Sequence, residues 1–452
     1  MRRLFITIIA VLFLLSILLC QPLTLDECIR LAAQQNYQVL AAQESLSISL
    51  SQRYQAVTTL LPSASATAAY TRLDKAPYAE FDPSAMLPEG SPPQDPIQVE
   101  MGKAEMEKTE IQVMQPIAAQ LFTAVSLANS GVQHKEITLL KSRLTSALSA
   151  EKAFFQYMQA SAFIEIANVS KSQIDAHITD LQNMYDQGIL HKKDLLKAQV
   201  QSSEMELLVL QAQNAQQITR SALAMTIGYS QDAQIIVTES LEYIEYPHSL
   251  DSVLAWAQRS AIDLRLLHIG LDASDKQVTL AWEGLLPSFA AIFNYDYQKP
   301  NRSLENEWYS SWTAVGAFQW DVFNWGANVS KIKQANAQMR QMGFIHKGAL
   351  DGISLQARAA YLTMDERRKK LDVARKELET TQENFRVTTD LFQAGAATNS
   401  ELLDAHSDLT RAKINFNTYL ADYNIARAEV EMLTGQLEAK VNKLITEENK
   451  NE

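Results

Sequence analysis

The sequence predicts a mainly α-helical chain with a small membrane β part and an internal two-fold repeat. Long coiled-coil helices would form an α-helical barrel, and four strands per chain would contribute to a β-barrel shared between chains. Three observations support this fold class: motifs that recur once along the chain, a heptad stripe near the C-terminus, and short aromatic segments of alternating polarity.

Composition narrows the functional class. The 452-residue chain has a formal charge of −12, so we do not expect nucleic acid as a partner. Its seven histidines are scattered, and the sequence contains no GxSxG, phosphate-loop, HxxxH or CxxC pattern. We therefore expect no catalytic residues, no metal site and no cofactor, and we do not expect an enzyme.

The N-terminus is typical of an exported protein. Residues 1–20 combine Arg2 and Arg3 with sixteen uncharged, mainly apolar residues, which indicates a secretory signal peptide. A retained anchor is the alternative, although this core is slightly short for a spanning helix. Cys20 is the last residue of this segment. It is either a lipidated cysteine or a residue next to an ordinary signal-peptide cleavage site. After processing, Cys28 would have no partner within the chain for a disulfide bond.

The rest of the chain consists of two copies of one unit. Leu25-Asp26 recur as Leu250-Asp251, and the motif "LLPS" occurs at the same place in both copies. Gly188 recurs as Gly395, 207 residues later (395 − 188). We place the first repeat at residues 21–247, the second at 248–435, and a polar C-terminal tail at 436–452.

Each copy predicts the same series of elements. A helix of about 35 residues ends at Pro62 or Pro287, because proline cannot continue a helix. Two strand-like segments follow, joined in the first copy by a longer loop at about residues 71–108. A helix of about 55–65 residues then reaches a glycine turn, and one of about 35 residues returns. At about 1.5 Å per residue the long helix measures roughly 90 Å, which indicates a coiled coil or a tube.

The last helix carries the clearest coiled-coil seam. Ten residues alternate steps of three and four along it: Leu402, Ala405, Leu409, Ala412, Phe416, Tyr419, Tyr423, Ala426, Val430 and Leu433. Such a stripe packs knobs into holes against a neighbouring helix. An ordinary two-helix coiled coil would show the same stripe. The matching stripe of the first copy, from Leu195 to Ala212, is more polar.

Four segments have the pattern of outer-membrane barrel strands. "PSFAAIFNYDYQK" and "SSWTAVGAFQW" alternate in polarity, and Tyr295, Tyr297, Trp312 and Trp320 are candidates for the membrane interface. "PSASATAAYTR" and "TEIQVMQPI" are weaker equivalents in the first copy. A small soluble sheet capping a coiled coil is the alternative. Four strands are too few to close a barrel, and an open sheet edge is not stable in lipid. Several chains would therefore have to share one closed barrel.

Together these motifs resemble the TolC-like outer-membrane efflux proteins, the outer membrane factors of tripartite efflux and type I secretion systems. The resemblance covers Leu23 to Gly435 and rests on "LTLDECIRLA", the corners "LLPS", "QPI" and "QWDVFNWG", and two "G-x5-[DE]-LL-x-A" tips. It implies a homotrimer with a shared 12-stranded β-barrel in outer-membrane lipid and a helical tunnel across the periplasm. It also implies docking to a periplasmic adaptor (membrane fusion) protein and to an inner-membrane pump of the RND, ABC or MFS type.

The resemblance places the two glycine turns at the periplasmic tips, where the tunnel narrows and a partner docks. Gly188 and Gly395 would supply the left-handed residue that ends each descending helix. "TNSE", residues 398–401, spells a capping box for the returning helix. The expected tip and adaptor-docking residues are Gly188, Asp194, Leu195, Phe392, Gly395 and Leu402.

Glu401 and Asp404 match two acidic positions that form the narrowest ring of the pore in the family. Their spacing of three places both on one helix face, so a trimer would direct six carboxylates at the lumen. Such a ring would favour cations over anions. Glu401 would otherwise only cap its helix.

A polar latch ties the closed tips together in the family. Asp194 and Phe392 occupy its acidic and aromatic places, but Phe392 lacks a hydroxyl and Ala397 holds the basic place. We therefore expect this latch to be missing, with Lys192 or Lys193 either substituting for it or forming plain solvated surface.

The sequence thus predicts a passive exit duct in the outer membrane with a large periplasmic part. The alternative is a periplasmic coiled-coil binding or structural protein without a pore. The transported substrate, the particular pump and adaptor, and the resting state of the gate are left open at this level.

Overall fold

The computed structural model describes residues 23–83, 88, 92, 95–301 and 305–448, so the predicted signal peptide and Cys20 lie outside the described part. Two compact units divide the chain and are considered separately. Unit 1 is Met1–Leu46, His134–His268 and Phe344–Glu452, and unit 2 is Ser47–Gln133 and Ile269–Gly343. The first-copy elements are α2 (Leu25–Gln35), α3 (Tyr37–Thr58), β1 (Ser63–Arg72), β2 (Tyr78–Phe81), β3 (Ile97–Glu100), β4 (Glu105–Ile117), α4 (Ala119–Asp186) and α5 (Lys192–Thr226).

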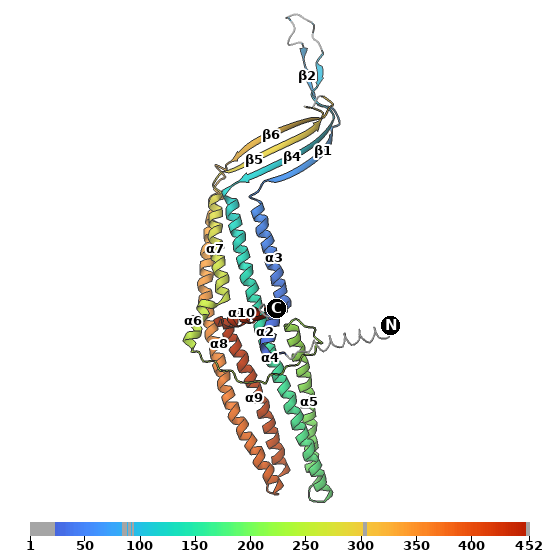
Figure 1. Cartoon of the computed structure of the whole chain (residues 1–452), viewed down its shortest axis with the longest axis vertical. Coiled ribbons are helices and arrows are strands. Elements are labelled where there is room, and N and C mark those ends of the chain that lie inside the picture. Colours follow the sequence, from blue (N-terminus) through green and yellow to red (C-terminus); the bar gives the residue numbers. More distant parts are fainter. Residues whose placement is uncertain (1–22, 84–87, 89–91, 93–94, 302–304, 449–452) are drawn as a thin grey trace, which may run out of the picture. The chain divides into compact units, whose positions relative to one another are not determined.

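The second copy repeats this order, except that its described part lacks the short strands β2 and β3 and is followed by one further helix, α10 (Figure 1). Its elements are α6 (Leu250–Ser260), α7 (Ile262–Glu283), β5 (Ser288–Lys299), β6 (Tyr309–Gln319), α8 (Ala327–Gln393), α9 (Asn399–Thr434) and α10 (Gln436–Glu448). The long helices α4 and α8 have 68 and 67 residues, slightly more than predicted, and the returning helices α5 and α9 have 35 and 36. The duplicated order of helices and strands is thus confirmed.

The first predicted helix of each copy is in fact two helices. Asn36 separates α2 from α3 with an extended backbone (ψ 135°), and Ala261 separates α6 from α7 (ψ 122°). The Asn36 side chain donates to Thr226 O at 2.9 Å and accepts from the backbone N–H of Gln38 at 2.9 Å. An Asn side chain that bonds the backbone in this way competes with the helical hydrogen bonds and starts a new helix.

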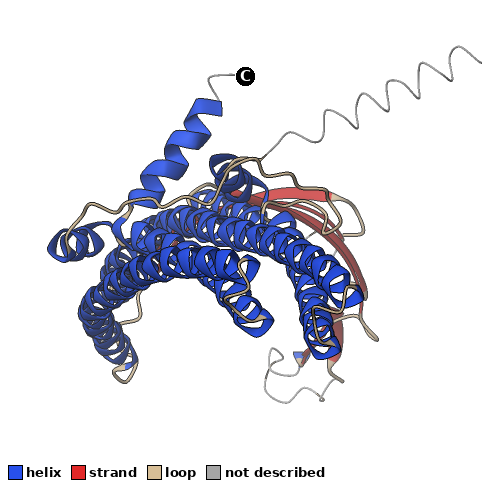
Figure 2. Ribbon diagram, turned by 90° about the horizontal axis from the view of Figure 1, so that it is seen from below, coloured by secondary structure: helices blue, strands red, loops and turns tan. Residues whose placement is uncertain are grey.

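In unit 1 the helices α8, α9, α4 and α5 lie side by side and follow a curved row (Figure 2). Apolar contacts hold each hairpin together. Between α8 and α9 they join Ile353, Ala357 and Met364 to Tyr423, Ala426 and Val430, and between α4 and α5 they join Ala167 to Val209 and Ala212. Seven of the ten predicted seam residues of α9 are buried, and the more polar α5 seam is buried at Leu195, Ala198, Met205, Val209 and Ala212.

The joint between α4 and α9 is polar instead. Gln159 Nε2 donates to Thr418 Oγ1 at 3.1 Å, and the Ser170 and Thr410 hydroxyls lie 2.9 Å apart. Lys152 pairs with Glu429 on the same two helices. The order of the row is therefore α8, α9, α4, α5. The seams inside each hairpin are apolar, and the seam between the hairpins combines these polar contacts with apolar ones near the tips, where Ile174 and Leu403 belong to one cluster.

The largest core cluster of unit 1 packs α2 and α10 against α4. Ile29, Phe154 and Leu437 are its central members, and each is at most 2% exposed. The segment predicted as a polar tail is thus a helix with a buried apolar side, formed by Leu437 and Val441. Cys28 lies in the same cluster as a free thiol, and burial raises its pKa to about 12, with smaller contributions from Glu27 and Glu239.

Unit 2 contains a four-stranded antiparallel sheet in the order β1-β4-β5-β6. The register pairs Ile111 with both Ala66 and Tyr295, and Tyr295 in turn with Trp312. The four predicted strands are confirmed, including the two weak ones of the first copy. The longer loop of that copy contains a ribbon that the sequence did not predict, in which β2 pairs with β3.

Candidate functional site

The two faces of the four-stranded sheet differ in chemistry. One face carries mostly apolar side chains: Ala64, Ala66, Ala68, Tyr70, Ile111, Val113, Ile117, Phe289, Ala291, Phe293, Tyr295, Tyr297, Trp312, Ala314 and Phe318. The polar residues of the same face are Arg72, Glu105, Glu107, Thr109, Gln115, Lys299 and Ser310. On β5 every residue of this face from Phe289 to Tyr297 is exposed, whereas the alternate residues are only partly exposed. An exposed sheet face that is mostly apolar, with large rings concentrated on β5, is the kind of surface that lipid, rather than water, would stabilise.

Three of the four predicted interface aromatics lie on this apolar face. Tyr295 is directly opposite Trp312, and the ring of Tyr297 stacks on Trp308 with centroids 4.7 Å apart. Trp320 follows the end of β6, and its indole N–H donates to Leu285 O at 3.0 Å while half of the side chain stays exposed. A ring with an apolar body and one satisfied polar atom is the type of side chain that membrane interfaces select.

The opposite face of the sheet carries polar and charged side chains. Lys108 Nζ lies 2.9 Å from Glu110 Oε2 and 3.0 Å from Asp296 Oδ1, on the neighbouring strands β4 and β5. Gln112 donates to Asn294 Oδ1 at 3.0 Å in the same two strands. One cation between two carboxylates leaves a net negative charge on this face, which suits contact with water.

Both glycine turns have the left-handed conformation that was expected of them. Gly188 has φ +75° and Gly395 has φ +72°. In the first turn Ile189 N donates to Met184 O at 3.0 Å, and in the second Ala396 N donates to Leu391 O at 2.8 Å. These bonds satisfy the last carbonyl groups of α4 and α8, so each long helix ends at a defined residue.

The start of α9 shows how Glu401 is held. Its carboxylate accepts from Thr398 N at 2.7 Å and from the Thr398 hydroxyl at 2.8 Å, while the same hydroxyl accepts from Glu401 N at 3.3 Å. These hydrogen bonds lower the pKa of the Glu401 carboxyl below its usual value. The predicted capping box is therefore present, and the carboxylate remains ionised and exposed.

Asp404 is exposed one turn further along α9. Within the described residues, no hydrogen bond or ion pair of its carboxylate is recorded, so its charge is not committed to helix capping. Leu402, between the two acids, is only 7% exposed and points away from solvent. The start of α9 thus exposes its two acids to solvent and packs Leu402 against the rest of the chain.

The two tips contact each other through a residue that the sequence analysis did not single out. Asn399 Oδ1 lies 2.8 Å from His177 Nε2 on α4, and Asn399 Nδ2 donates to Asp194 O at 3.0 Å on α5. Lys197 also donates to the Ser400 hydroxyl. The only sequence signal was the position of Asn399 inside the capping motif, which gave no indication of contacts more than 200 positions away.

The other predicted tip residues lie around this bridge. Leu195 packs with Leu403 in one apolar cluster, and Phe392 is partly buried against it. Phe392 also meets the His177 ring edge to face, with centroids 5.3 Å apart. Lys192 and Lys193 are exposed, so the connection recorded within the chain runs through Asn399 and Lys197 rather than through these two residues.

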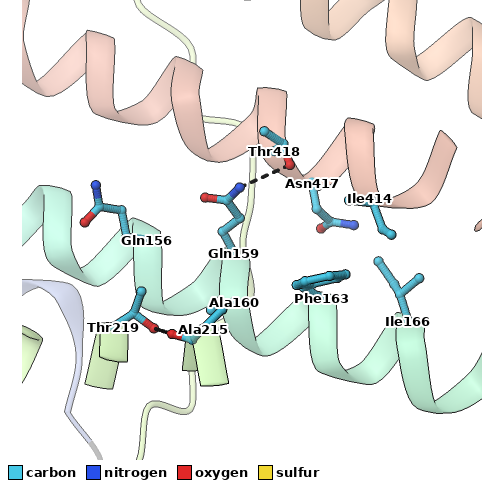
Figure 3. Close-up of a pocket in the computed structure, with 10 residues that line it drawn as sticks. All are labelled: Gln156, Gln159, Ala160, Phe163, Ile166, Ala215, Thr219, Ile414, Asn417 and Thr418. Atoms are coloured by element: carbon cyan, nitrogen blue, oxygen red, sulfur yellow. Dashed lines mark hydrogen bonds between the residues drawn. The ribbon is translucent and has the colours of Figure 1, made fainter. Parts of the chain in front are cut away.

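A cavity of about 290 Å³ opens between α4, α5 and α9 further along the helices (Figure 3). Figure 3 shows Gln159 reaching from α4 to Thr418, beside Phe163 and Asn417. Amides and hydroxyls alternate here with apolar side chains. Among the described residues no group of three or more His, Cys, Asp or Glu could hold a metal ion.

Comparisons with known proteins agree with this geometry. The family model described as "Outer membrane efflux protein" matches residues 254–436. The chain has the fold of the TolC-like outer-membrane efflux proteins. The resemblance predicted from its motifs is therefore confirmed, and the match lies in the second repeat, where those motifs are clearest.

Solved structures give the same result over nearly the whole chain. The Campylobacter jejuni CmeC outer membrane channel aligns with a TM-score of 0.72 and 16% identity, covering 94% of this chain and 89% of that one. The outer membrane protein VceC from Vibrio cholerae aligns with a TM-score of 0.70 and 15% identity, covering 91% of this chain and 96% of that one. The open state of the Neisseria gonorrhoeae MtrE outer membrane channel aligns with a TM-score of 0.72 and 14% identity, covering 91% of this chain and 88% of that one. No curated protein sequence matches the chain.

Within the described residues of this TolC-like fold, no helix combines the length and the hydropathy that a membrane-crossing helix needs.

Proposed function

We propose that this chain is the outer-membrane exit duct of a tripartite efflux or type I secretion system, with a large periplasmic part and passive conduction of substrates. The observation that carries the proposal is the four-stranded sheet, apolar and exposed on one face and polar on the other. Its edge strands β1 and β6 have no strand partner among the described residues. In lipid, unpaired edges would leave backbone amides without hydrogen bonds, so neighbouring copies must pair them.

Exposed stripes on two helices of unit 1 support the same assembly. On α5 the stripe contains Leu196, Val200, Leu207, Leu210, Ile218 and Met225, each between 49% and 61% exposed. At about 100° per residue, this stripe lies roughly opposite the seam that α5 buries against α4. A helix that is apolar on two opposite sides needs a neighbour on both.

Helix α8 carries a similar stripe of exposed apolar residues: Leu355, Leu362, Val373, Val387 and Leu391. Since α5 and α8 are the first and last helices of the row in unit 1, a second copy would cover one stripe with the other. Such a head-to-tail contact repeats until a ring closes. Three copies would supply twelve strands and twelve helical columns, as the TolC-like resemblance implies.

The tip turns are the proposed docking surface for a periplasmic adaptor, which in turn joins an inner-membrane pump of the RND, ABC or MFS type. Ile189 beside Gly188 is 68% exposed and lies outside the α5 stripe that a second copy would cover. Apolar side chains exposed at a helical turn favour contact with another protein. The Glu401 and Asp404 carboxylates would form the narrowest ring of the pore.

The test is the behaviour of the protein in its native membrane. We expect it to stay in the membrane pellet after a carbonate wash and, once extracted in detergent, to have about three times the mass of one chain. A monomer released without detergent would overturn the proposal. The leading interpretation would then be a periplasmic coiled-coil binding protein.

A further inference from the structure

A second cavity in unit 1 lies next to the tips and is lined by α4, α8 and α9. Its volume is about 300 Å³, at the lower end of the range for small-molecule sites. Its apolar wall includes Ile174, Leu402 and Leu403, and the aromatic rings of Phe385 and Phe392 complete it. The cavity is therefore large enough for one compact aromatic molecule.

Two imidazoles belong to the cavity lining and stiffen its wall. The ring of His406, 3% exposed, meets Phe385 with centroids 5.5 Å apart, and its Nε2 lies 3.2 Å from Gln173 Oε1. Because the Gln173 oxygen only accepts, His406 Nε2 carries the proton. The ring of His177 is held by Asn399 and Phe392. Both aromatic rings of the wall are thus fixed by edge-to-face contacts.

The charge of the lining has one sign. Asp180 is the sole charged residue among the twelve described residues that line the cavity, and its side chain is exposed at the rim. Burial, Lys413 and His177 lower the pKa of His406 to about 4, so this imidazole adds no positive charge at neutral pH. A carboxylate beside two aromatic faces attracts an organic cation by charge and by cation–π contact.

We propose that this cavity binds a small aromatic ammonium compound, with its ring among Phe385, Phe392 and Leu403 and its charged nitrogen toward Asp180. Nothing in the duct function requires such a site, and the inference concerns unit 1 alone. A bound molecule would contact both hairpins at once, because α4 belongs to the first and α8 and α9 to the second. It would therefore stabilise the arrangement of the hairpins seen here.

The experiment is equilibrium dialysis of the full-length protein in phosphatidylcholine nanodiscs, with empty nanodiscs as the baseline for partitioning. The probes are 1-naphthylmethylamine, a cation at pH 7, and the neutral 1-naphthalenemethanol of nearly the same shape. We expect saturable binding of up to one molecule per chain, and about fivefold tighter binding of the amine, as a partly exposed charge contact provides. Absence of saturable amine binding would overturn the proposal.

Two variants locate the site. Asp180→Asn, at an exposed position, should remove the difference between the probes and leave alcohol binding unchanged. Thr389→Phe should fill the cavity and abolish binding of both probes. The matched controls are Asp186→Asn, an exposed acid on the same helix, and Thr219→Phe, which fills the cavity of Figure 3. A preference for the amine that persists in Asp180→Asn, or binding that survives Thr389→Phe, would contradict the assignment.

Discussion

Arg427 Nη2 on α9 donates to Glu151 Oε1 on α4 at 2.9 Å, and the two side chains are 7% and 0% exposed. Arg427 also pairs with Glu431 one turn further along its own helix. Burial raises the pKa of the Glu151 carboxyl, whereas Lys440 and Arg427 act in the opposite direction. This pair is a buried part of the joint between the hairpins, as the Ser170 and Thr410 hydroxyls are.

Removal of one partner should destabilise this joint strongly. Arg427→Ala leaves the Glu151 carboxylate buried without its cation, which costs about 3–5 kcal/mol in comparable cases. We expect a clear fall in the unfolding temperature of the detergent-extracted protein. The control is Arg411→Ala, which breaks an exposed pair with Asp408 on the same helix and should cost less than about 1 kcal/mol. Equal effects of the two substitutions would show that burial of the pair does not matter.

Two glycines at equivalent places in the repeats should tolerate no side chain. A Cβ at Gly228 (φ +85°) would lie 2.7 Å from Gln35 O, and a Cβ at Gly435 (φ +79°) would lie 2.8 Å from Ser260 Cβ. Alanine at either position therefore adds a steric clash to the left-handed backbone cost of about 1–2 kcal/mol. Thermal unfolding of Gly228→Ala and Gly435→Ala measures the sum of the two effects.

Gly188→Ala and Gly395→Ala are the matched controls for this pair. Both glycines are left-handed as well, but a Cβ at either would meet nothing within 4 Å. Alanine at either position should therefore lower the stability only by the cost of the left-handed backbone, about 1–2 kcal/mol. If all four variants lost the same stability, the close approach at the ends of α5 and α9 would have no energetic effect.

Stability should fall as the pH is lowered from 6.5 to about 4. His406 has a pKa of about 4 in the folded chain, against an ordinary value of 6.5, so between these limits the unfolded chain binds a proton that the folded chain does not. The total loss is roughly 3 kcal/mol, reached once the pH is below 4. The charged or titratable groups around the ring are His177 and Asp180 from α4 and Lys413 from α9.

The measurement is the unfolding temperature across this pH range for the unaltered protein and for His406→Gln. The substituted protein should show a smaller dependence on pH in this range. His191→Gln, at an exposed turn position, serves as the control and should leave the dependence unchanged. An unaltered slope in His406→Gln would assign the pH dependence to other groups.

The two acids at the start of α9 should contribute unequally to ion selectivity. Asp404→Asn removes a charge that is free to act on passing ions, so the reversal potential in a KCl gradient should shift toward zero. Glu401→Gln should shift it less, because that carboxylate is bonded to Thr398, and it should also weaken the helix start by about 1 kcal/mol. Asp408→Asn, at an acid already paired with Arg411, is the control. Unchanged cation preference in both variants would refute the carboxylate ring.

The duplication made most of the fold predictable. Each motif appeared twice, so weak signals in the first copy, such as the strand at Ser63–Arg72, could be placed by the stronger strand at Ser288–Lys299. The glycine turns and the capping box were readable because each depends on a few adjacent residues. Periodicity alone was sufficient for the seam of α9, since seven of its ten positions are buried.

Features that depend on distant contacts were not predictable. The break at Asn36 interrupts an otherwise helical pattern, and one of the two hydrogen bonds of the Asn36 side chain joins it to Thr226 O, 190 positions away. The β2–β3 ribbon has only four residues per strand, too few for a period to emerge. Asn399 and Arg427 were missed for the same reason, because a polar residue within a helix does not reveal which distant side chain it meets.

The polar joint between α4 and α9 also bears on how the chain folds. Its contacts join residues separated by 222 to 277 positions, whereas each hairpin closes through a turn of a few residues. Because contacts of low sequence separation generally form faster, we expect the α4–α5 hairpin to be complete before its partner is available. During that interval water can hydrate the serine, glutamine and lysine side chains of α4. These polar side chains reduce the apolar surface that α4 exposes during this interval, and exposed apolar surface promotes aggregation of partly folded chains.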